Sequence, residues 1–365
     1  MRAATPTVLT GDASILRGHG ELAMVWSRTP TAPQRLALLG GPASTLRHVS
    51  VPGAASQPSW SPDGRWLAVH VAERTPAVRR AETLWLVGDD GTPVRRLTPR
   101  TADVQSARWS PRADRLAVVT HRPGAHVDRL SLVHRNGSSR VLAKAQAIEN
   151  VAWSPSGRRL AVSLNAFRHQ QWHSRLVVIP AGSGGHRRTV TAVDGILDLA
   201  AWWPDGSRLL VWDGAVGSSL GADGLPLDVV TMSGHRHQIA NPVLGYGSWI
   251  ALSRAKNEIA VIEGGDRELT AGHKAVAICT PQRCQRVRQP AHQISIDPSW
   301  SASGRLAVVR DRAISPSRGF GPLYVKRVQD SGDITIVTKS TARRLTVAGH
   351  GATAPQWGRD GSLLV

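Results

Sequence analysis

Phenylalanine and tyrosine are nearly absent from this sequence: two residues of each occur among 365, against 13 tryptophans. Tryptophan is normally the rarest of the three, so this imbalance indicates one structural position that is used many times. The chain has no run of about eighteen apolar residues, which excludes a conventional membrane-spanning helix. Long helical periodicity is missing too, which argues against a fold of alternating strands and helices.

Acidic residues are scarce, with 26 Asp and Glu against 45 Lys and Arg, and the formal net charge is +19. Most of the basic residues are arginine, a bias that a GC-rich genome also produces. A net charge of this size still predicts attraction to anionic partners at low salt. Hydrophobic residues make up 41% of the chain, enough for a sizeable core, which argues against wholesale disorder.

There are only two cysteines, Cys279 and Cys284, between two predicted strands. A disulfide across a short hairpin would fit this spacing and would imply an oxidising compartment. Two reduced thiols are the alternative. No further ligands are spaced to complete a metal site, and we expect neither a metal nor a cofactor.

The two ends of the sequence resemble those of a fragment. Residues 1–6 lack the apolar core of a signal peptide, and the chain stops at Val365 inside a repeat copy.

A repeat with a period of about 50 residues runs through the chain. Its clearest copy, from Pro58 to Val69, has a tryptophan, a Ser-Pro-Asp-Gly turn and an apolar strand. The turn residues that stand out are Asp63, Gly64, Asp205 and Gly206. The repeated tryptophans are Trp60, Trp109, Trp153, Trp202, Trp300 and Trp357. Leu252 takes the tryptophan position in one degenerate copy, and a weaker copy starts near Leu16.

Each copy contains the pattern of four short strands joined by turns. An all-β protein with about seven such units predicts a closed β-propeller, and we expect seven four-stranded blades. Eight blades is the alternative, because residues 5–10 also resemble a fourth strand. We expect residues 1–365 to form a single domain, in which the N- and C-terminal segments share a blade.

The motif around Trp60, continued by the Arg-Arg-Leu-Thr strand that starts at Arg95, resembles the TolB-like (WD40-like) propeller repeat. The resemblance covers almost the whole chain. It implies a binding scaffold in the cell envelope, extracytoplasmic or periplasmic, with a cytoplasmic location as the alternative because no signal peptide is visible. The chain departs from TolB itself, since it shows no N-terminal α/β domain and more than six units.

Variable connections between the second and third strands of each unit, such as residues 73–82 and 164–175, are the expected binding surface, because function usually lies on variable loops of a rigid scaffold. The segment from Phe167 to His173 combines aromatic and cationic groups and is the best single candidate for a contact patch. The candidate binding residues on these connections are Arg79, Arg80, His121, Arg122, Phe167, Arg168, Trp172, His173, Arg312, Arg318 and Phe320.

Most of the net charge lies instead in the predicted fourth strands, which contain no acidic residue, and we expect it to form an arginine-rich outer rim. Protection of exposed strand edges is the simpler interpretation. The alternative is a surface for an anionic envelope polymer, lipid head groups or an acidic protein. The charge comes without an RNA-binding or helix-turn-helix motif, so nucleic acid is not the expected partner.

Two motifs suggest chemistry but lack its context. Residues 217–221 match the G-x-S-x-G nucleophile elbow, yet that motif needs a strand–turn–helix setting, so we interpret the match as chance. His169 and His173 fall on a different predicted face from His235 and His237, and no carboxylate cluster joins either pair.

The sequence therefore predicts a non-catalytic propeller that acts as a protein- or ligand-binding scaffold. The alternative hypothesis is the gating propeller of a prolyl-oligopeptidase-type serine peptidase, whose hydrolase domain is absent from this chain. The propellers of that family resemble this repeat. A third hypothesis, a propeller lyase or glycosidase, would require histidines and carboxylates that converge in one cleft. The partner itself cannot be named from the sequence.

Overall fold

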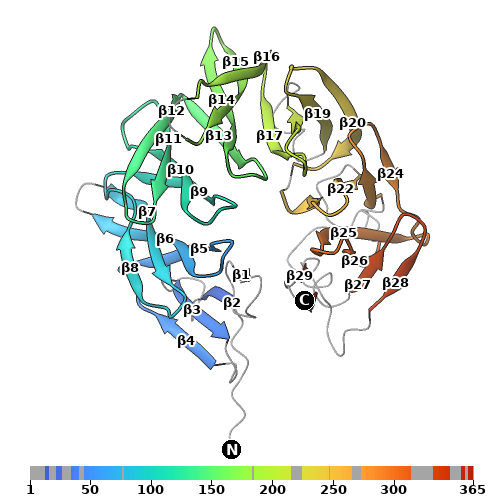
Figure 1. Ribbon diagram of the computed structural model, residues 1–365, viewed down its shortest axis with the longest axis horizontal. Coiled ribbons are helices and arrows are strands. Elements are labelled where there is room, and N and C mark those ends of the chain that lie inside the picture. The colour runs from blue at the N-terminus through green and yellow to red at the C-terminus, as the bar shows by residue number, and fades with distance from the viewer. Residues whose placement is uncertain are drawn as a thin grey trace, which may run out of the picture. The chain divides into compact units, whose positions relative to one another are not determined.

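A computed structural model describes residues 13–15, 22–26, 34–40, 45–75, 78–182, 185–214, 224–245, 247–264, 273–313, 332–345, 355–357 and 361–364. Regular structure in these residues consists of 30 β-strands and one 3₁₀ helix, η2 (Gly247–Trp249). None of the described helical structure is long and apolar enough to cross a membrane. The chain divides into two compact units, residues 1–148 and 149–365 (Figure 1).

The first unit contains three four-stranded antiparallel sheets, each in chain order. Their strands are β1 (Ala13–Ile15), β2 (Leu22–Trp26), β3 (Arg35–Gly40), β4 (Thr45–Val49); β5 (Ala54–Trp60), β6 (Trp66–Thr75), β7 (Val78–Gly88), β8 (Pro93–Arg96); and β9 (Asp103–Trp109), β10 (Arg115–His121), β11 (Asp128–His134), β12 (Ser139–Ala145).

The second unit continues the same meander pattern. Its strands are β13 (Ala147–Trp153), β14 (Arg159–Arg168), β15 (Gln171–Pro180), β16 (Arg188–Asp194); β17 (Leu197–Trp202), β18 (Arg208–Asp213), β19 (Leu225–Thr231), β20 (Arg236–Val243); β21 (Ile250–Ser253), β22 (Glu258–Glu263), β23 (Ala275–Cys279), β24 (Cys284–Arg286); β25 (Gln293–Trp300), β26 (Leu306–Arg312), β27 (Asp333–Val337), β28 (Ala342–Arg344); and β29 (Gln356–Trp357), β30 (Leu363–Leu364). One pair, Val243 and Glu263, links β20 to β22.

The described strands thus form seven four-stranded sets and one separate pair, β29–β30. These sets confirm the all-β, four-strand repeat that the sequence predicts. The shared terminal blade stays a prediction, because β1–β4 and β29–β30 belong to different units whose relative position is not determined.

In the described copies, the turn after the repeated tryptophan forms as its residues dictate. In the clearest copy the Gly64 N–H donates to the Ser61 carbonyl over 2.8 Å, and Gly64 has a φ of 76°. Glycine takes such a φ without the steric cost that a Cβ brings. In the copy after Trp109 the same position is Ala113, which has a φ of 58°.

Some of the repeated tryptophans, among them Trp109 and Trp357, connect neighbouring sheets. The indole nitrogen of Trp109 donates to the backbone oxygen of Ser59, and that of Trp357 to Ser299, each over 2.9 Å. Both acceptors directly precede the tryptophan of the preceding sheet. Arg305 adds to this seam, since its guanidinium lies 4.6 Å from the centroid of Trp357 and donates to the Gly361 carbonyl over 3.0 Å.

At another seam Leu252 stands in the tryptophan position and is 41% exposed. Trp203, which stands where most other copies have serine, is completely buried among residues that include Ile259 and Val261 of the next four-strand set. The side chain of Asn257 also donates to the Asp205 carboxylate over 3.0 Å across the same seam. The second tryptophan of the Trp-Trp pair thus contributes buried packing between these two sets of strands.

Two connections that the sequence predicts as long loops are extended strands instead. Residues 73–82 belong mainly to β6 and β7, and residues 164–175 to β14 and β15. In the second hairpin pairing continues to Arg168 and Gln171. Pairing across the hairpin satisfies the backbone groups there, so a polar side-chain composition does not prevent strand formation.

Candidate functional site

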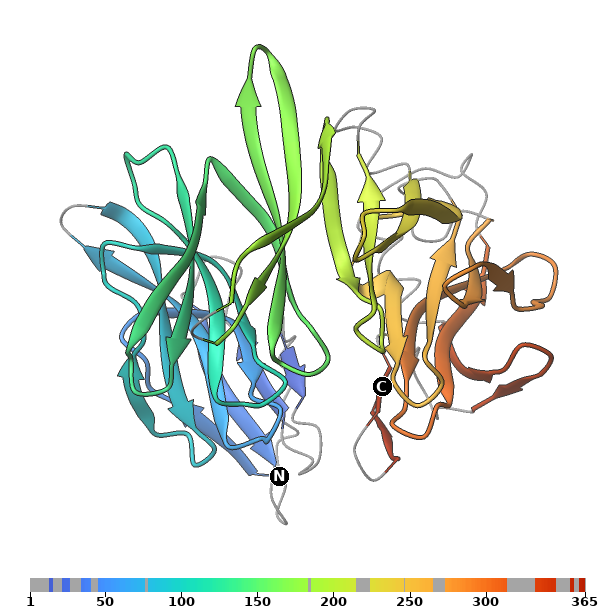
Figure 2. The same cartoon turned by 45° about the horizontal axis from the view of Figure 1, so that its top comes forward.

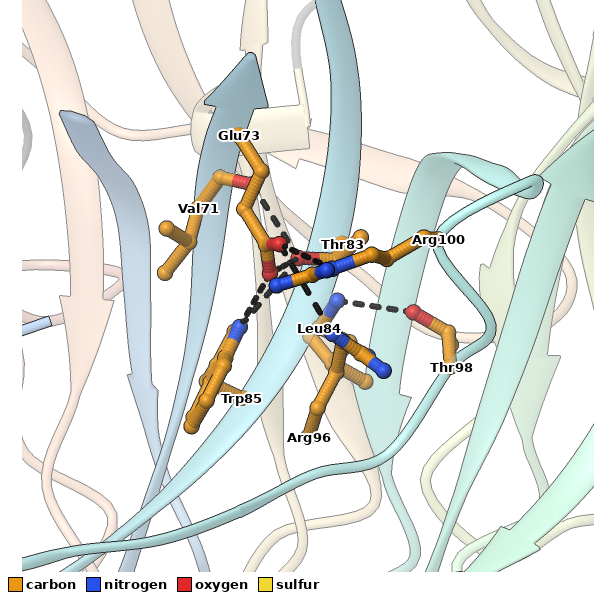
Figure 3. A network of polar contacts seen from close by, with 8 residues as sticks. All are labelled: Val71, Glu73, Thr83, Leu84, Trp85, Arg96, Thr98 and Arg100. Carbon is orange, nitrogen blue, oxygen red and sulfur yellow. Dashed lines mark hydrogen bonds and ion pairs between the residues drawn. The ribbon is translucent and has the colours of Figure 1, made fainter. Parts of the chain in front are cut away.

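Two groups of polar side chains lie on opposite faces of the β6–β7 hairpin. Glu73 is the centre of the first (Figure 3). Its carboxylate accepts hydrogen bonds from Thr83 Oγ1 over 2.8 Å, Trp85 Nε1 over 2.9 Å and Arg100 Nε over 3.0 Å. Arg96 lies 3.7 Å away as an ion pair, and the Glu73 side chain is only 5% exposed. This network joins three consecutive strands and the segment after them.

Burial raises the pKa of Glu73, but the donors Trp85, Thr83 and Arg100 and the charge of Arg96 outweigh it, and the pKa lies below its usual value. Both carboxylate oxygens have partners. The network therefore stabilises the hairpin and its neighbours, and the carboxylate needs no ligand to compensate its charge.

The second group surrounds His70 on the other face of the hairpin. His70 lines a cleft of about 270 Å³ with Gln57, Ser59 and Arg108. The imidazole is 3% exposed, and its Nδ1 lies 3.2 Å from the Glu82 carboxylate. Since a carboxylate only accepts, Nδ1 carries the proton. Within the described residues, the other nitrogen, Nε2, has no hydrogen bond to a protein group.

A bulge in β5 shapes one wall of this cleft. The pairing with β6 shifts between Ser56 and Ser59, and Gln57 between them has a φ of 45°. A positive φ in a residue with a Cβ costs of order 1–3 kcal/mol and is commonly found near functional sites. Ser56 is the cross-strand partner of His70, and its buried hydroxyl has no partner among the described residues.

Two histidines predicted as binding residues have carboxylate partners of their own. His121 Nδ1 lies 2.9 Å from Asp128, and His173 Nδ1 lies 2.7 Å from Asp194. Each pair joins adjacent strands of one sheet, β10–β11 or β15–β16. Asp128 also accepts the Ile148 N–H over 3.0 Å. The His121–Asp128 pair therefore also bonds to the strand that contains Ile148.

Phe167 and Trp172, the core of the predicted contact patch, are brought together at the end of the β14–β15 hairpin. Their ring centroids are 5.3 Å apart, and Phe167 is 46% exposed. A two-residue turn follows, in which His169 and Gln170 have φ values of 50° and 64°. Pairing of β15 with β16 ends at His173, and Figure 2 shows this light-green hairpin projecting beyond its sheet.

The other predicted binding residues are separate from this tip. Arg122 is exposed after β10 and Arg312 is exposed at the end of β26. Arg79 and Arg80 belong to β7, but their side chains lie outside the described structure. Arg318 and Phe320 lie outside the described residues altogether, as does the G-x-S-x-G match at 217–221.

Several rim arginines make contacts within the protein. Arg47 of β4 donates to the carbonyls of Asp89 and Asp90 in the next sheet, over 3.3 and 3.2 Å. Arg95 of β8 donates likewise to Asn136, over 2.6 Å. These rim arginines thus bond one sheet to a turn of the neighbouring sheet, a role that the charge count did not predict.

Arginines of the fourth strands also pair with acids in their own sheets. Arg344 lies 2.7 Å from Asp333, and Arg286 pairs with Glu263. Arg236 bridges two carboxylates, Asp213 and Asp228; burial raises the pKa of Asp228, partly offset by the charge of Arg236. These pairs reduce the net charge that the rim presents to solvent.

The two cysteines are cross-strand partners in β23 and β24, and a disulfide joins Cys279 to Cys284. The oxidising compartment remains a prediction. Among the residues that the structure describes, no three His, Cys, Asp or Glu side chains gather in a way that could hold a metal ion.

Solved structures similar to this chain are propellers of peptidases. The β-propeller domain of the trilobed protease from Pyrococcus furiosus matches with a TM-score of 0.55 at 11% identity, over 92% of this chain and 97% of that one. Acylaminoacyl peptidase from Pyrococcus horikoshii matches with a TM-score of 0.56 at 10% identity, over 93% of this chain and 52% of that one. Puromycin hydrolase matches with a TM-score of 0.58 at 17% identity, over 98% of this chain and 58% of that one.

A scan of family models and a search of curated proteins found no match, so the TolB-like resemblance remains a prediction. This chain spans nearly all of one isolated propeller domain but only about half of the complete peptidases. At identities this low the similarity shows the fold alone. The chain has a β-propeller fold, of the kind found in the propeller domains of prolyl-oligopeptidase-type peptidases.

Proposed function

We propose that this chain is the propeller domain of a prolyl-oligopeptidase-type serine peptidase and controls access to a hydrolase domain outside the chain. One observation carries the proposal: peptidase propellers match 92% to 98% of this chain. The chain in turn covers only about half of each complete enzyme. This favours the gating hypothesis over a free-standing scaffold. The proposed catalytic serine is not in this chain.

A labelling experiment on the native protein tests this proposal. An antibody against residues 1–365 isolates the protein from its source, and a fluorophosphonate probe labels any activated serine in it. A labelled polypeptide well above 39.1 kDa, with heat-denatured protein as the unlabelled control, is the expected result. An unlabelled polypeptide of 39.1 kDa with no labelled associate would overturn the proposal. The coding frame beyond codon 365 provides an independent check.

A second function, protein binding by a scaffold, is favoured by one observation: the Phe167–Trp172 pair at the projecting hairpin tip. Residues 166–172 carry Arg168 and no acid, so the tip suits an acidic partner surface that accepts an aromatic anchor.

The test is affinity capture with a Phe167→Ser/Trp172→Ser double variant. A partner retained by the wild type should be lost. Val141→Ser is the matched control, because Val141 is similarly exposed, at 47%, but lies in the other unit. Equal capture by the double variant and the wild type would contradict this function.

A further inference from the structure

The hairpin of β23 and β24 ends in a turn that contacts the preceding four-strand set. The Pro281 carbonyl of this turn lies 2.7 Å from Nε2 of His237, a residue of β20. Since a carbonyl only accepts hydrogen bonds, Nε2 carries the proton and donates it. A displaced turn would therefore lose a hydrogen bond that joins two sets of strands.

Two kinds of link hold this turn closed. The Thr280 N–H donates to the Arg283 carbonyl over 2.9 Å, and the disulfide joins the next cross-strand pair, Cys279 and Cys284. β24 has only three residues and is the outermost strand of its sheet, so few ladder bonds hold it. The disulfide is thus the covalent link between the end of this short edge strand and its neighbour.

The two cysteines differ in their access to solvent. Cys279 is completely buried, whereas Cys284 is partly exposed on the outermost strand. Arg283 beside it is exposed, and its positive charge attracts a thiolate, which is the species that attacks a disulfide. A reducing thiol therefore reaches the bond from the Cys284 side.

We propose that the Cys279–Cys284 disulfide is a redox-sensitive link, which a dithiol reductant opens while the rest of the fold stays intact. A thiolate of the reductant attacks Sγ of Cys284, the S–S bond breaks, and Cys279 leaves as a thiolate that takes up a proton. The second thiol of the reductant then displaces Cys284, which is protonated in turn. Two electrons pass to the protein, and the reductant ends as a disulfide.

Reduction should act locally, at the contact between β20 and this hairpin. The two cysteines are only five residues apart, and a disulfide that closes so short a loop constrains the unfolded chain least. With the bond open, hydrogen bonds alone hold the turn, so the Pro281–His237 bond should be broken more often. This inference does not depend on the proposed function, since every group in it belongs to this chain.

The experiment uses the isolated 365-residue chain in native buffer, with dithiothreitol as the reductant and N-ethylmaleimide to trap free thiols. Mass spectrometry should find two trapped thiols without denaturant, and far-ultraviolet circular dichroism should be unchanged. Amide exchange in residues 280–286 should accelerate about tenfold, and the NMR resonance of His237 should shift. The β11–β12 turn, residues 134–138, has similar backbone bonds but no cysteine, and its exchange should not change.

The double variant Cys279→Ser/Cys284→Ser should exchange like the reduced wild type, whether or not dithiothreitol is present. If this variant does not fold, the reduced wild-type chain provides the same measurement, and His237→Gln identifies the histidine resonance. A disulfide that is reduced only in denaturant would overturn the proposal. So would reduction that leaves both the exchange of residues 280–286 and the His237 resonance unchanged.

Discussion

Trp203 is fully buried, whereas Leu252, which takes the tryptophan position of the next repeat copy, is 41% exposed. Each departs from the pattern of its own repeat copy, and Trp203 packs in a buried cluster with Ile259 and Val261 of the following strands. Serine stands at the position of Trp203 in most other copies, and tryptophan at that of Leu252.

The hypothesis that Trp203 occupies the space of the missing indole at position 252 predicts coupled mutational effects. Trp203→Ser should destabilise the protein by about 3–5 kcal/mol through loss of a buried indole, and Leu252→Trp alone should give little or no gain because Trp203 fills the space. The double variant should regain about 1–3 kcal/mol relative to the sum of the single changes. Urea unfolding measures all four proteins, and strictly additive effects would contradict the compensation.

The repeated tryptophans predict a difference between two conservative substitutions. Trp202 donates to the Ala152 carbonyl over 2.9 Å, whereas the indole nitrogen of Trp300 has no partner among the described residues. Trp202→Phe should therefore cost about 1 kcal/mol more than Trp300→Phe, because it leaves a backbone carbonyl unpaired. Thermal or urea unfolding gives the comparison; equal losses would show that the indole bond contributes nothing.

The turn after Trp109 contains a strained residue that can be relieved. Ala113 has a φ of 58°, where the repeat normally has glycine. Ala113→Gly should raise the free energy of unfolding by about 0.5–1 kcal/mol, since glycine accepts this φ without steric cost. Gly64→Ala, at a φ of 76°, makes the reverse change and should lower the free energy of unfolding. A loss of stability in Ala113→Gly would disprove strain at this turn.

The Glu73 network predicts a loss of stability in acid. The folded pKa of Glu73 is lowered from its ordinary value of 4.5, so its contribution is fully present above pH 4.5 and is lost as pH falls through the folded pKa. Glu73→Gln should be less stable than the wild type at pH 7 by about 1–3 kcal/mol, and the gap should narrow below pH 4.5. Urea midpoints between pH 7 and 3 test this, and a constant gap would be inconsistent with it.

The arginine rim predicts a separation of binding from stability. Arg187 and Arg188 are exposed, whereas Arg96 pairs with Glu73. If the rim binds anions, Arg187→Gln/Arg188→Gln should elute earlier from an anionic matrix with an unchanged Tm. Arg96→Gln should lower the Tm. If the double variant elutes at the same position as the wild type, anion binding by the rim is contradicted and protection of strand edges is the remaining interpretation of its charge.

The period of the tryptophans and the Pro-Asp-Gly turns were sufficient to predict four-stranded units, because turn chemistry and alternating burial are local properties. The strand extensions at residues 73–82 and 164–175 were missed, since polar side chains there are compatible with pairing in a projecting hairpin. The sequence does carry a signal for the bulge in β5 and for a second bulge in β25, where the pairing with β26 shifts between Ile296 and Ser299. Gln57 and Asp297, the positive-φ residues of the two bulges, both precede a Pro-Ser-Trp segment.

The sequence by itself determined that this is a repeated all-β chain and which residues form its turns and seams. Only the tertiary structure decided that Glu82 holds His70 at a cleft, that Trp203 is buried while Leu252 is exposed, and that several rim arginines are bonded within the protein. The physical reason is the separation along the sequence of the residues that interact. Turns and strands follow from neighbours in sequence, whereas a cleft or an ion pair depends on residues that pairing register brings together.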